Sequence, residues 1–152
     1  LLDFEPHAGM KALTKGLNEL YKTEPALYEN GFSTEGFEWI ELNDYQNSAL
    51  SFIRKGKKEE DNLAIICNFT PVVRENYRIG INRGTWEEVF NSDDKAYWGS
   101  GISNSGKIKS EAQPHHGRPN SMELTLPPLS VIIFKQVPAK KSTKKASAKA
   151  KK

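Results

Sequence analysis

Residues 63–69 read LAIICNF, the most continuously apolar of the strand-like stretches in the chain. Its length suits a strand, and its lack of alternating polar residues is typical of a strand covered on both faces. Lys55-Gly56 precedes it and Pro71 follows it, and proline cannot donate to a strand ladder, so Pro71 belongs in a connection. This stretch is therefore predicted to be a central strand of a sheet.

Short strand-like segments recur on both sides of this centre, separated by turn-forming residues such as Asn82-Arg83-Gly84 and Pro127-Pro128. About eight short strands at this spacing, with only one helix, favour an all-β fold, an antiparallel β-sandwich. The other predicted strands are Phe37–Leu42, Ala49–Lys55, Tyr77–Ile81, Thr85–Asn91, Lys107–Ala112, Ser121–Leu126 and Ser130–Val137.

The one predicted helix precedes all the strands. Pro6 lies near its start, and Glu24-Pro25 ends it because proline disfavours helical backbone at the residue before it. Its apolar residues fall at helical spacing and form one stripe, for which the sequence offers no second helix as a partner. They are Met10, Leu13, Leu17, Leu20 and Tyr21.

Charge is distributed unevenly along the 152 residues. The net charge is +3, but seven of the 22 basic residues lie in the segment AKKSTKKASAKAKK at 139–152, which leaves 15 basic against 19 acidic residues, or −4, for the rest. The lysine-rich segment has nothing to bury and is predicted to be disordered, with at most non-specific contact to polyanions. A dedicated nucleic-acid function is not expected, because neither aromatic residues nor arginines are interleaved with the lysines.

The compartment predicted from composition is the cytoplasm. No apolar run approaches the length of a membrane span and no signal peptide is visible, so no membrane partner is expected. Cys67 is the only cysteine, whereas small secreted domains usually carry several. With Ile65, Ile66 and Phe69 beside it, Cys67 is interpreted as a small buried hydrophobe.

Several motifs that suggest chemistry fail on inspection, so no cofactor, metal or catalytic residue is predicted. Gly101–Lys107 matches a phosphate-binding loop, but Ile108 follows where a hydroxyl is needed, and a strand follows instead of a helix. His115-His116 has no further metal ligands at a usual spacing. The adjacent carboxylates are interpreted as solvated charge: Glu59-Glu60, Glu87-Glu88 and Asp93-Asp94.

The aromatic residues are the strongest candidates for binding. A flat ring offers an apolar face to the C–H groups of a glucose unit, although core packing is the commoner role of any single ring. Trp39 is the first choice, because simple alternation puts Phe37, Trp39 and the charged Glu41 on one face of the strand. Weaker candidates for glucan binding are Trp98, Tyr97 and Trp86.

Several long strings, in order, resemble the C-terminal region of bacterial 1,4-α-glucan (glycogen) branching enzymes of the α-amylase superfamily. The resemblance extends from Leu1 to about Val137 and excludes the lysine-rich segment. The strings are HAGMKALTKGLNELYKTEPALYE, GFEWIELND, SFIRKG, CNFTPVVRENYRIGI, GTWEEVFNSDDKAYWGSGISNSG, HHGRPNS and LTLPPLSVIIFK.

The resemblance implies a division of the chain into three parts. Residues 1–30 would be the last helix and exit segment of a missing (β/α)8 catalytic barrel. Residues 31–138 would be a Greek-key sandwich of the α-amylase C-terminal type, and residues 139–152 a tail. The parent would transfer an α-1,4-glucan segment to a 6-hydroxyl in glycogen biosynthesis, with carboxylates on the absent barrel.

By this resemblance the chain alone would be non-catalytic. It would support its own barrel and hold glycogen or another α-glucan. Two alternatives stay open: the C-terminal domain of another α-glucan-acting barrel enzyme, such as an amylase or debranching enzyme, or a stand-alone carbohydrate-binding module.

Overall fold

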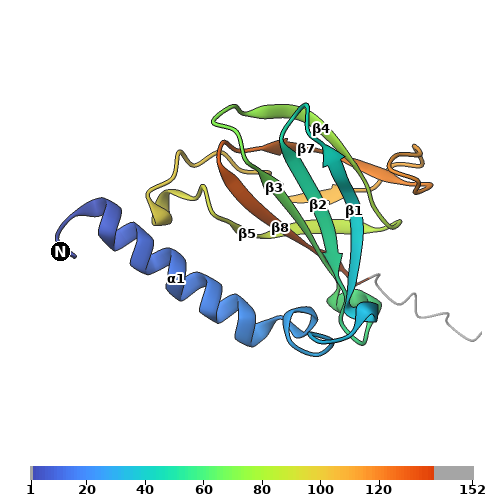
Figure 1. Ribbon diagram of the computed structural model, residues 1–152, viewed down its shortest axis with the longest axis horizontal. Coiled ribbons are helices and arrows are strands. Elements are labelled where there is room, and N and C mark those ends of the chain that lie inside the picture. The colour runs from blue at the N-terminus through green and yellow to red at the C-terminus, as the bar shows by residue number, and fades with distance from the viewer. Residues whose placement is uncertain (1, 139–152) are drawn as a thin grey trace, which may run out of the picture.

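The computed structural model describes residues 2–138, so the predicted tail at 139–152 lies outside it. A single α-helix, α1 (Glu5–Thr23), precedes a set of antiparallel strands (Figure 1). Four short 3-10 turns connect them: η1 (Pro25–Leu27), η2 (Thr34–Gly36), η3 (Glu59–Asp61) and η4 (Lys95–Tyr97). The strands are β1 (Phe37–Asp44), β2 (Ala49–Arg54), β3 (Leu63–Asn68), β4 (Arg74–Gly80), β5 (Thr85–Asn91), β6 (Lys107–Lys109), β7 (Ser121–Leu126) and β8 (Ser130–Val137).

The strands form two antiparallel sheets. Six of them make one sheet in the order β1-β2-β3-β8-β5-β6, and β4 pairs with β7 in the other. All six residues of β3 are buried, and β3 lies between β2 and β8, which confirms the central position predicted for LAIICNF. Pro71 and Pro127 lie in connections as expected, because the ladders would lose a donor at either residue.

The main core lies between the two sheets. Ile53, Ile66 and Phe134 from the large sheet pack with Ile79 and Met122 from β4 and β7, and each of these side chains is at most 1% exposed. The predicted all-β antiparallel sandwich is therefore confirmed, because the apolar faces of the two sheets cover each other.

The outer face of the large sheet carries a second apolar cluster that includes Leu63, Ile65 and Ile133. Leu13 and Leu20 of α1, two of the five residues of the predicted stripe, pack against this cluster, so the sheet and not a second helix covers this part of the stripe. Figure 1 shows α1 running along this side of the molecule. Close to its C-terminal end, Lys135 of β8 forms an ion pair with Glu24 at 2.7 Å.

The buried side of α1 includes glycines, which the search for apolar residues overlooked. Gly9, Leu13, Gly16 and Leu20 recur at offsets of four, three and four. A Cβ at Gly9 would lie 2.7 Å from both Trp98 Cβ and the Tyr97 carbonyl oxygen, so the helix approaches η4 closely only because this residue has no side chain. The other three residues of the predicted stripe remain exposed: Met10, Leu17 and Tyr21.

Most strand boundaries agree with the prediction. β5, β7 and β8 have the predicted bounds, whereas β4 begins at Arg74, three residues earlier than expected. β6 ends at Lys109 and not at Ala112. The Ser110 N–H still donates to the Gly84 carbonyl, but the Gly84 N–H donates to the Ser110 hydroxyl instead of to a backbone carbonyl, so the ladder stops here. β6 begins at Lys107, so the predicted strand, and not the helix that follows a phosphate-binding loop, continues from Gly101–Lys107.

Candidate functional site

Trp39 lies on β1, the edge strand of the large sheet, with 47% of its surface exposed. Its ring meets the edge of Phe37 at a centroid distance of 4.8 Å, and Phe52 lies 5.8 Å away. Phe37 and Phe52 stack at 5.1 Å. We call these three residues the Trp39 surface. Their mutual packing fixes the indole while leaving part of its ring open to solvent.

The prediction that Trp39 shares a face with Glu41 is wrong. The β1–β2 register shifts between the two residues, so that Trp39 pairs with Phe52 while Glu41 pairs with Ser51. This bulge rotates Glu41 to the opposite face, where its carboxylate lies 3.6 Å from His116 Nε2. Trp39 is thus exposed because it sits on an edge strand outside the area covered by α1, not because a charged neighbour keeps its face in water.

A hollow of about 440 Å³ lies beside Phe52 on the same side of the sheet. Tyr21, Tyr28 and Phe32 contribute aromatic rings to its wall, and Arg54 contributes a cation. Aromatic walls with a few polar groups suit a sugar chain, whose C–H faces pack on rings while its hydroxyls reach polar side chains. Sequence reasoning missed Tyr28 and Phe32, because they lie in an irregular connection without a periodic pattern.

Trp98 and Tyr97 lie elsewhere, at η4 beside the N-terminal half of α1. Trp98 is 62% exposed and has a left-handed backbone with φ 68°. Tyr97 is half-buried: its ring packs 5.8 Å from Phe90, and its hydroxyl lies against Gly16. Tyr97 therefore serves mainly to seat the helix, and the structure does not bring this pair together with Trp39.

Trp86 is fully buried at 0% exposure in the core between the sheets. Its indole N–H donates to the Asn82 carbonyl at 3.2 Å, which satisfies its one polar atom. The prediction of Trp86 as a weaker glucan-binding residue is corrected, because neither face of its ring is available to a ligand.

The carboxylates of the described residues serve mainly in structural contacts. Asp93 is buried and accepts from the Ser100 hydroxyl at 2.5 Å and from the backbone N–H groups of Ser100 and Ile102. Glu38 pairs with Lys55 and Arg118, and the hydrogen bond from Lys55 contributes most to lowering the pKa of that carboxyl. These contacts hold loops and strand edges together.

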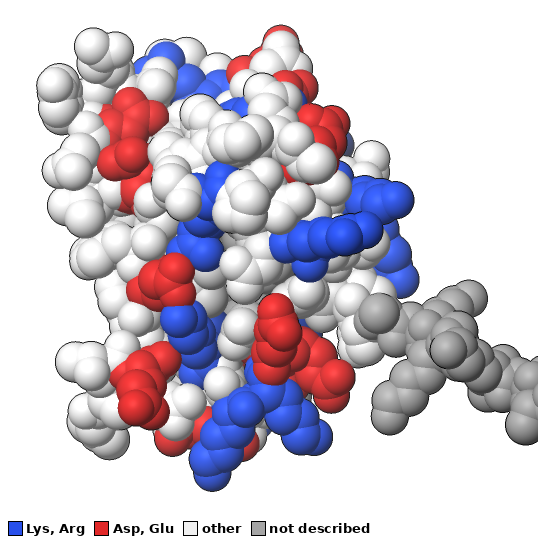
Figure 2. All heavy atoms as spheres, turned by 90° about the vertical axis from the view of Figure 1, so that its right-hand side faces the viewer, with Lys and Arg blue, Asp and Glu red and all other residues white. Residues whose placement is uncertain are grey.

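Charges of both signs are interspersed on the face shown in Figure 2, and neither sign covers it alone. Within residues 2–138, no group of His, Cys, Asp or Glu side chains is arranged to hold a metal ion. No helix in this range has the length and apolarity that a bilayer span requires. Burial raises the pKa of the Cys67 thiol, in agreement with its predicted role as a small buried hydrophobe.

The sequence is similar to those of several bacterial enzymes over most of its length. The chain is 48% identical over 136 residues to the 1,4-alpha-glucan branching enzyme GlgB of Aquifex aeolicus, covering 89% of this chain and 22% of that protein. It is 50% identical to the GlgB protein of Cereibacter sphaeroides (88% and 18% covered) and 45% identical to that of Trichormus variabilis (97% and 19%). It thus spans about a fifth of the length of these relatives.

A more distant likeness is to the crystal structure of an alpha-amylase from H. orenii, with a TM-score of 0.47 and 17% identity, covering 82% of this chain and 20% of that one. The family model described as "Alpha amylase, C-terminal all-beta domain" matches residues 39–137, which run from Trp39 on β1 to the end of β8. The chain belongs to the α-amylase C-terminal all-β domain family.

Proposed function

We propose that this chain is the C-terminal domain of a 1,4-α-glucan branching enzyme and acts within that enzyme as a non-catalytic α-glucan-holding and supporting domain. The observation that carries the proposal is identity of 45–50% over 88–97% of the chain to proteins that bear this name. Such identity over nearly the whole chain favours a branching enzyme over the other α-glucan-acting barrel enzymes. The reaction would take place in the cytoplasm, in the remaining four-fifths of the parent.

The proposal that this chain alone does not catalyse is supported by the roles of two of its carboxylates. Retaining transfer of a glucan segment needs a carboxylate nucleophile about 5 Å from a carboxylic acid, both facing bound sugar. Asp93 and Glu38 instead hold loops and neighbouring strands through hydrogen bonds and ion pairs. The catalytic pair would therefore be supplied by the parent's barrel.

The supporting role rests on two exposed residues of the α1 stripe. Met10 and Leu17 lie two turns apart on one flank of α1, and each is more than 40% exposed. Bare apolar residues of this kind are usually covered in the complete protein. In the parent these two residues would pack against the barrel, while Leu13 and Leu20 fasten the same helix to the sandwich.

The glucan-holding role rests on the Trp39 surface and the aromatic hollow beside it. Phe52 belongs to both, so the rings form one continuous apolar area on the outer side of β1 and β2. Such an area would bind a chain of glucose units by stacking of the sugar faces on the rings, without selecting a particular position along the chain. The aromatic pair at η4 would contribute less, because Tyr97 is used in packing.

A chimera tests the proposal. This chain replaces the corresponding region of the Aquifex aeolicus branching enzyme, and activity is followed by the fall in iodine colour of amylose. The chimera should branch amylose, the same enzyme with the region deleted should not, and this chain alone should leave the colour unchanged. A soluble, folded chimera without activity, or branching by the isolated chain, would contradict the proposal.

A further inference from the structure

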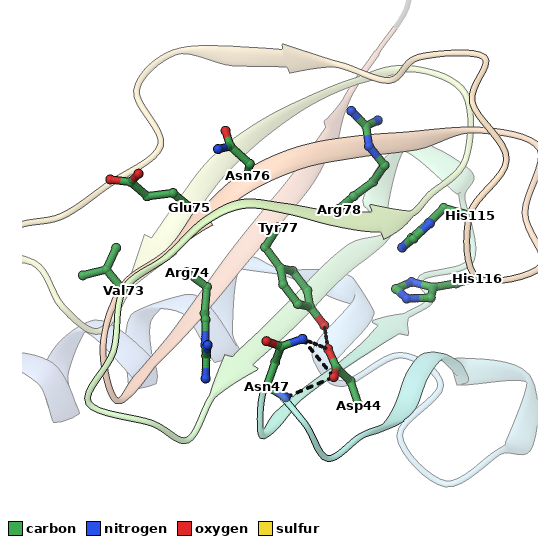
Figure 3. Close-up of a pocket in the computed structure, with 10 residues that line it drawn as sticks. All are labelled: Asp44, Asn47, Val73, Arg74, Glu75, Asn76, Tyr77, Arg78, His115 and His116. Carbon is green, nitrogen blue, oxygen red and sulfur yellow. Dashed lines mark hydrogen bonds between the residues drawn. The ribbon is translucent and has the colours of Figure 1, made fainter.

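A second, polar pocket opens where β1, β4 and the loop at 113–119 meet (Figure 3). Its volume is about 450 Å³, and Trp39 is not among the residues that line it. Asp44 ends β1, Asn47 lies in the following turn, and Arg74 and Tyr77 come from β4. Figure 3 shows these four side chains on one side of β4, with the imidazoles of His115 and His116 entering from the loop.

Asp44 is the fixed centre of this pocket. The Tyr77 hydroxyl donates to its Oδ2 at 2.7 Å, and Asn47 Nδ2 donates to both carboxylate oxygens at 3.0 Å. Although burial opposes it, these hydrogen bonds together lower the pKa of Asp44, so the carboxylate is charged at neutral pH. Carboxylate, amide and phenol are thus held in one rigid arrangement without bound ligand.

Arg74 carries hydrogen-bonding capacity that the protein leaves unused. Its Nε is buried without a hydrogen-bond partner, and within residues 2–138 its guanidinium forms no ion pair. A buried donor without a partner costs about 1–3 kcal/mol, so natural proteins keep few of them. The arginine lines the pocket, where an oxygen atom of a ligand could accept from the terminal N–H groups of its guanidinium, and a small shift of the side chain would bring the shielded Nε–H within reach as well.

The His116 imidazole is neutral at pH 7 and is held by a backbone hydrogen bond. The Gly80 N–H donates to His116 Nδ1 at 3.2 Å, which places the His116 proton on Nε2. Burial, then the neighbouring His115, lowers the pKa of His116 against the opposing effect of Glu41 and Asp44. A side chain at Gly80 would collide with the His115 carbonyl, so glycine lets the histidine loop lie against β4.

The charge of the pocket selects the class of ligand. Asp44 is negative and lies on the same side of β4 as Arg74, whereas Figure 3 shows Glu75 and Arg78 on the other side. The positive charge of Arg78 is already paired with Glu111 at 2.8 Å and Glu123 at 3.0 Å. A phosphate beside Arg74 would therefore also meet the Asp44 carboxylate, and no second unpaired cation. A neutral polyol meets a mixture of donors and acceptors, with the Tyr77 ring beside them, which is how protein sites orient sugar hydroxyls.

We propose that this pocket is a second α-glucan site, separate from the Trp39 surface, in which Arg74 donates to hydroxyl or ring oxygens and Asp44 accepts from a sugar hydroxyl. The identity of the sugar as α-glucan rests on the proposed function. The pocket volume of about 450 Å³ would hold a short segment or a chain end of the glucan. Two sites on different faces would let the domain hold two segments of one branched molecule.

The test uses the Trp39→Ala chain, which removes the first surface, and maltoheptaose as the probe. The Arg74 Nε–H signal in nitrogen-15 NMR, identified by its absence in Arg74→Met, should shift saturably with added maltoheptaose. In calorimetry, Arg74→Met should weaken binding by about fivefold or more, the loss of one or two hydrogen bonds. Arg83→Met, which removes the same charge from an exposed arginine outside this pocket, should leave affinity unchanged.

An unmoved Arg74 signal, or equal affinities of the Arg74 and Arg83 variants, would overturn the proposal. So would a signal that responds to inorganic phosphate and not to maltoheptaose, because the pocket would then be an anion site. The chimera assay keeps the two ideas apart. An active chimera with an unresponsive Arg74 rejects the pocket alone, whereas an inactive chimera counts against the proposed function whatever Arg74 does.

Discussion

The close approach of α1 to η4 makes Gly9→Val the most informative perturbation of the fold. A Cβ at this position would lie 2.7 Å from Trp98 Cβ, 2.7 Å from the Tyr97 carbonyl oxygen and 2.9 Å from the Tyr97 carbonyl carbon. Two of these atoms belong to the backbone and cannot rotate away, so the helix or η4 must move by several tenths of an ångström. Overpacking of this kind costs about 1–3 kcal/mol.

Helix propensity acts in the opposite direction. Valine is a better helix former than glycine by about 0.5 kcal/mol, so the net loss expected for Gly9→Val is about 1–2 kcal/mol. In a chain of this size that lowers the thermal midpoint by roughly 3–8 °C. Thermal unfolding followed by circular dichroism and urea unfolding followed by tryptophan fluorescence measure the two quantities.

Gly31→Val is the matched control. The nearest atom to a Cβ at Gly31 is the Tyr28 carbonyl oxygen at 3.7 Å, an ordinary contact, and its backbone is outside the left-handed region. This variant should therefore change stability by less than about 0.5 kcal/mol. If Gly9→Val were neutral or stabilising, α1 would not pack on η4 as described, and its inclusion in the folded unit would be refuted.

Three further predictions concern single side chains. Trp86→Ala should lower the free energy of unfolding, measured in urea, by about 3–5 kcal/mol, because it empties the space of a fully buried indole. Trp98→Ala should change the same free energy by less than about 0.5 kcal/mol, since this indole is exposed. Equal losses in the two variants would contradict the difference in burial. Burial lowers the pKa of His116 below its ordinary value of 6.5, so the unfolded chain binds the proton more tightly than the folded chain. The folded state is therefore most stable above about pH 6.5 and loses stability as the pH falls below that value. His116→Asn, in which asparagine tolerates the left-handed backbone at φ 47°, should flatten the decline of the thermal midpoint between about pH 7.5 and about pH 5.5, and an unchanged slope would argue against this role. Tyr77→Phe should cost about 1–2 kcal/mol at neutral pH by removing the hydrogen bond to Asp44, and a neutral result would mean that this bond is open in solution.

Strands were predictable from the sequence wherever burial follows a simple pattern. The continuous apolar run of β3 identified a central strand because both of its faces are covered. β7 and β8 are bounded by Pro127-Pro128 and an irregular loop, so local turn chemistry set their ends. The fold class followed from these segments, since their number and spacing leave few alternatives to a sandwich.

The aromatic site was less predictable because β-bulges break the two-residue period. In β5 the register shifts between Glu88 and Phe90, so Trp86 enters the core between the sheets while Phe90 enters the cluster on the outer face. In β1 a similar shift separates Trp39 from Glu41. An alternation rule applied across either shift assigns the wrong face, even where the final prediction of exposure for Trp39 is right.

The polar pocket and the helix contact were not predictable for a different reason. Asp44, Arg74 and His116 are far apart in sequence. They come together only because the two sheets pack on each other and the loop at 113–119 lies beside them. Gly9 and Gly16 carry no apolar side chain, and their role appears only where another segment approaches the helix closely. Both features depend on tertiary contacts that local patterns do not encode.

The measurement closest to the central claim is retardation of the chain in native gels that contain glycogen. The wild type, Trp39→Ala and Trp98→Ala are compared, the last as a control that removes a still more exposed tryptophan from another part of the molecule. We expect glycogen to retard the wild type and Trp98→Ala, and Trp39→Ala to lose most of the retardation. Equal mobility of all three variants with and without glycogen would contradict a glucan-holding role for the domain.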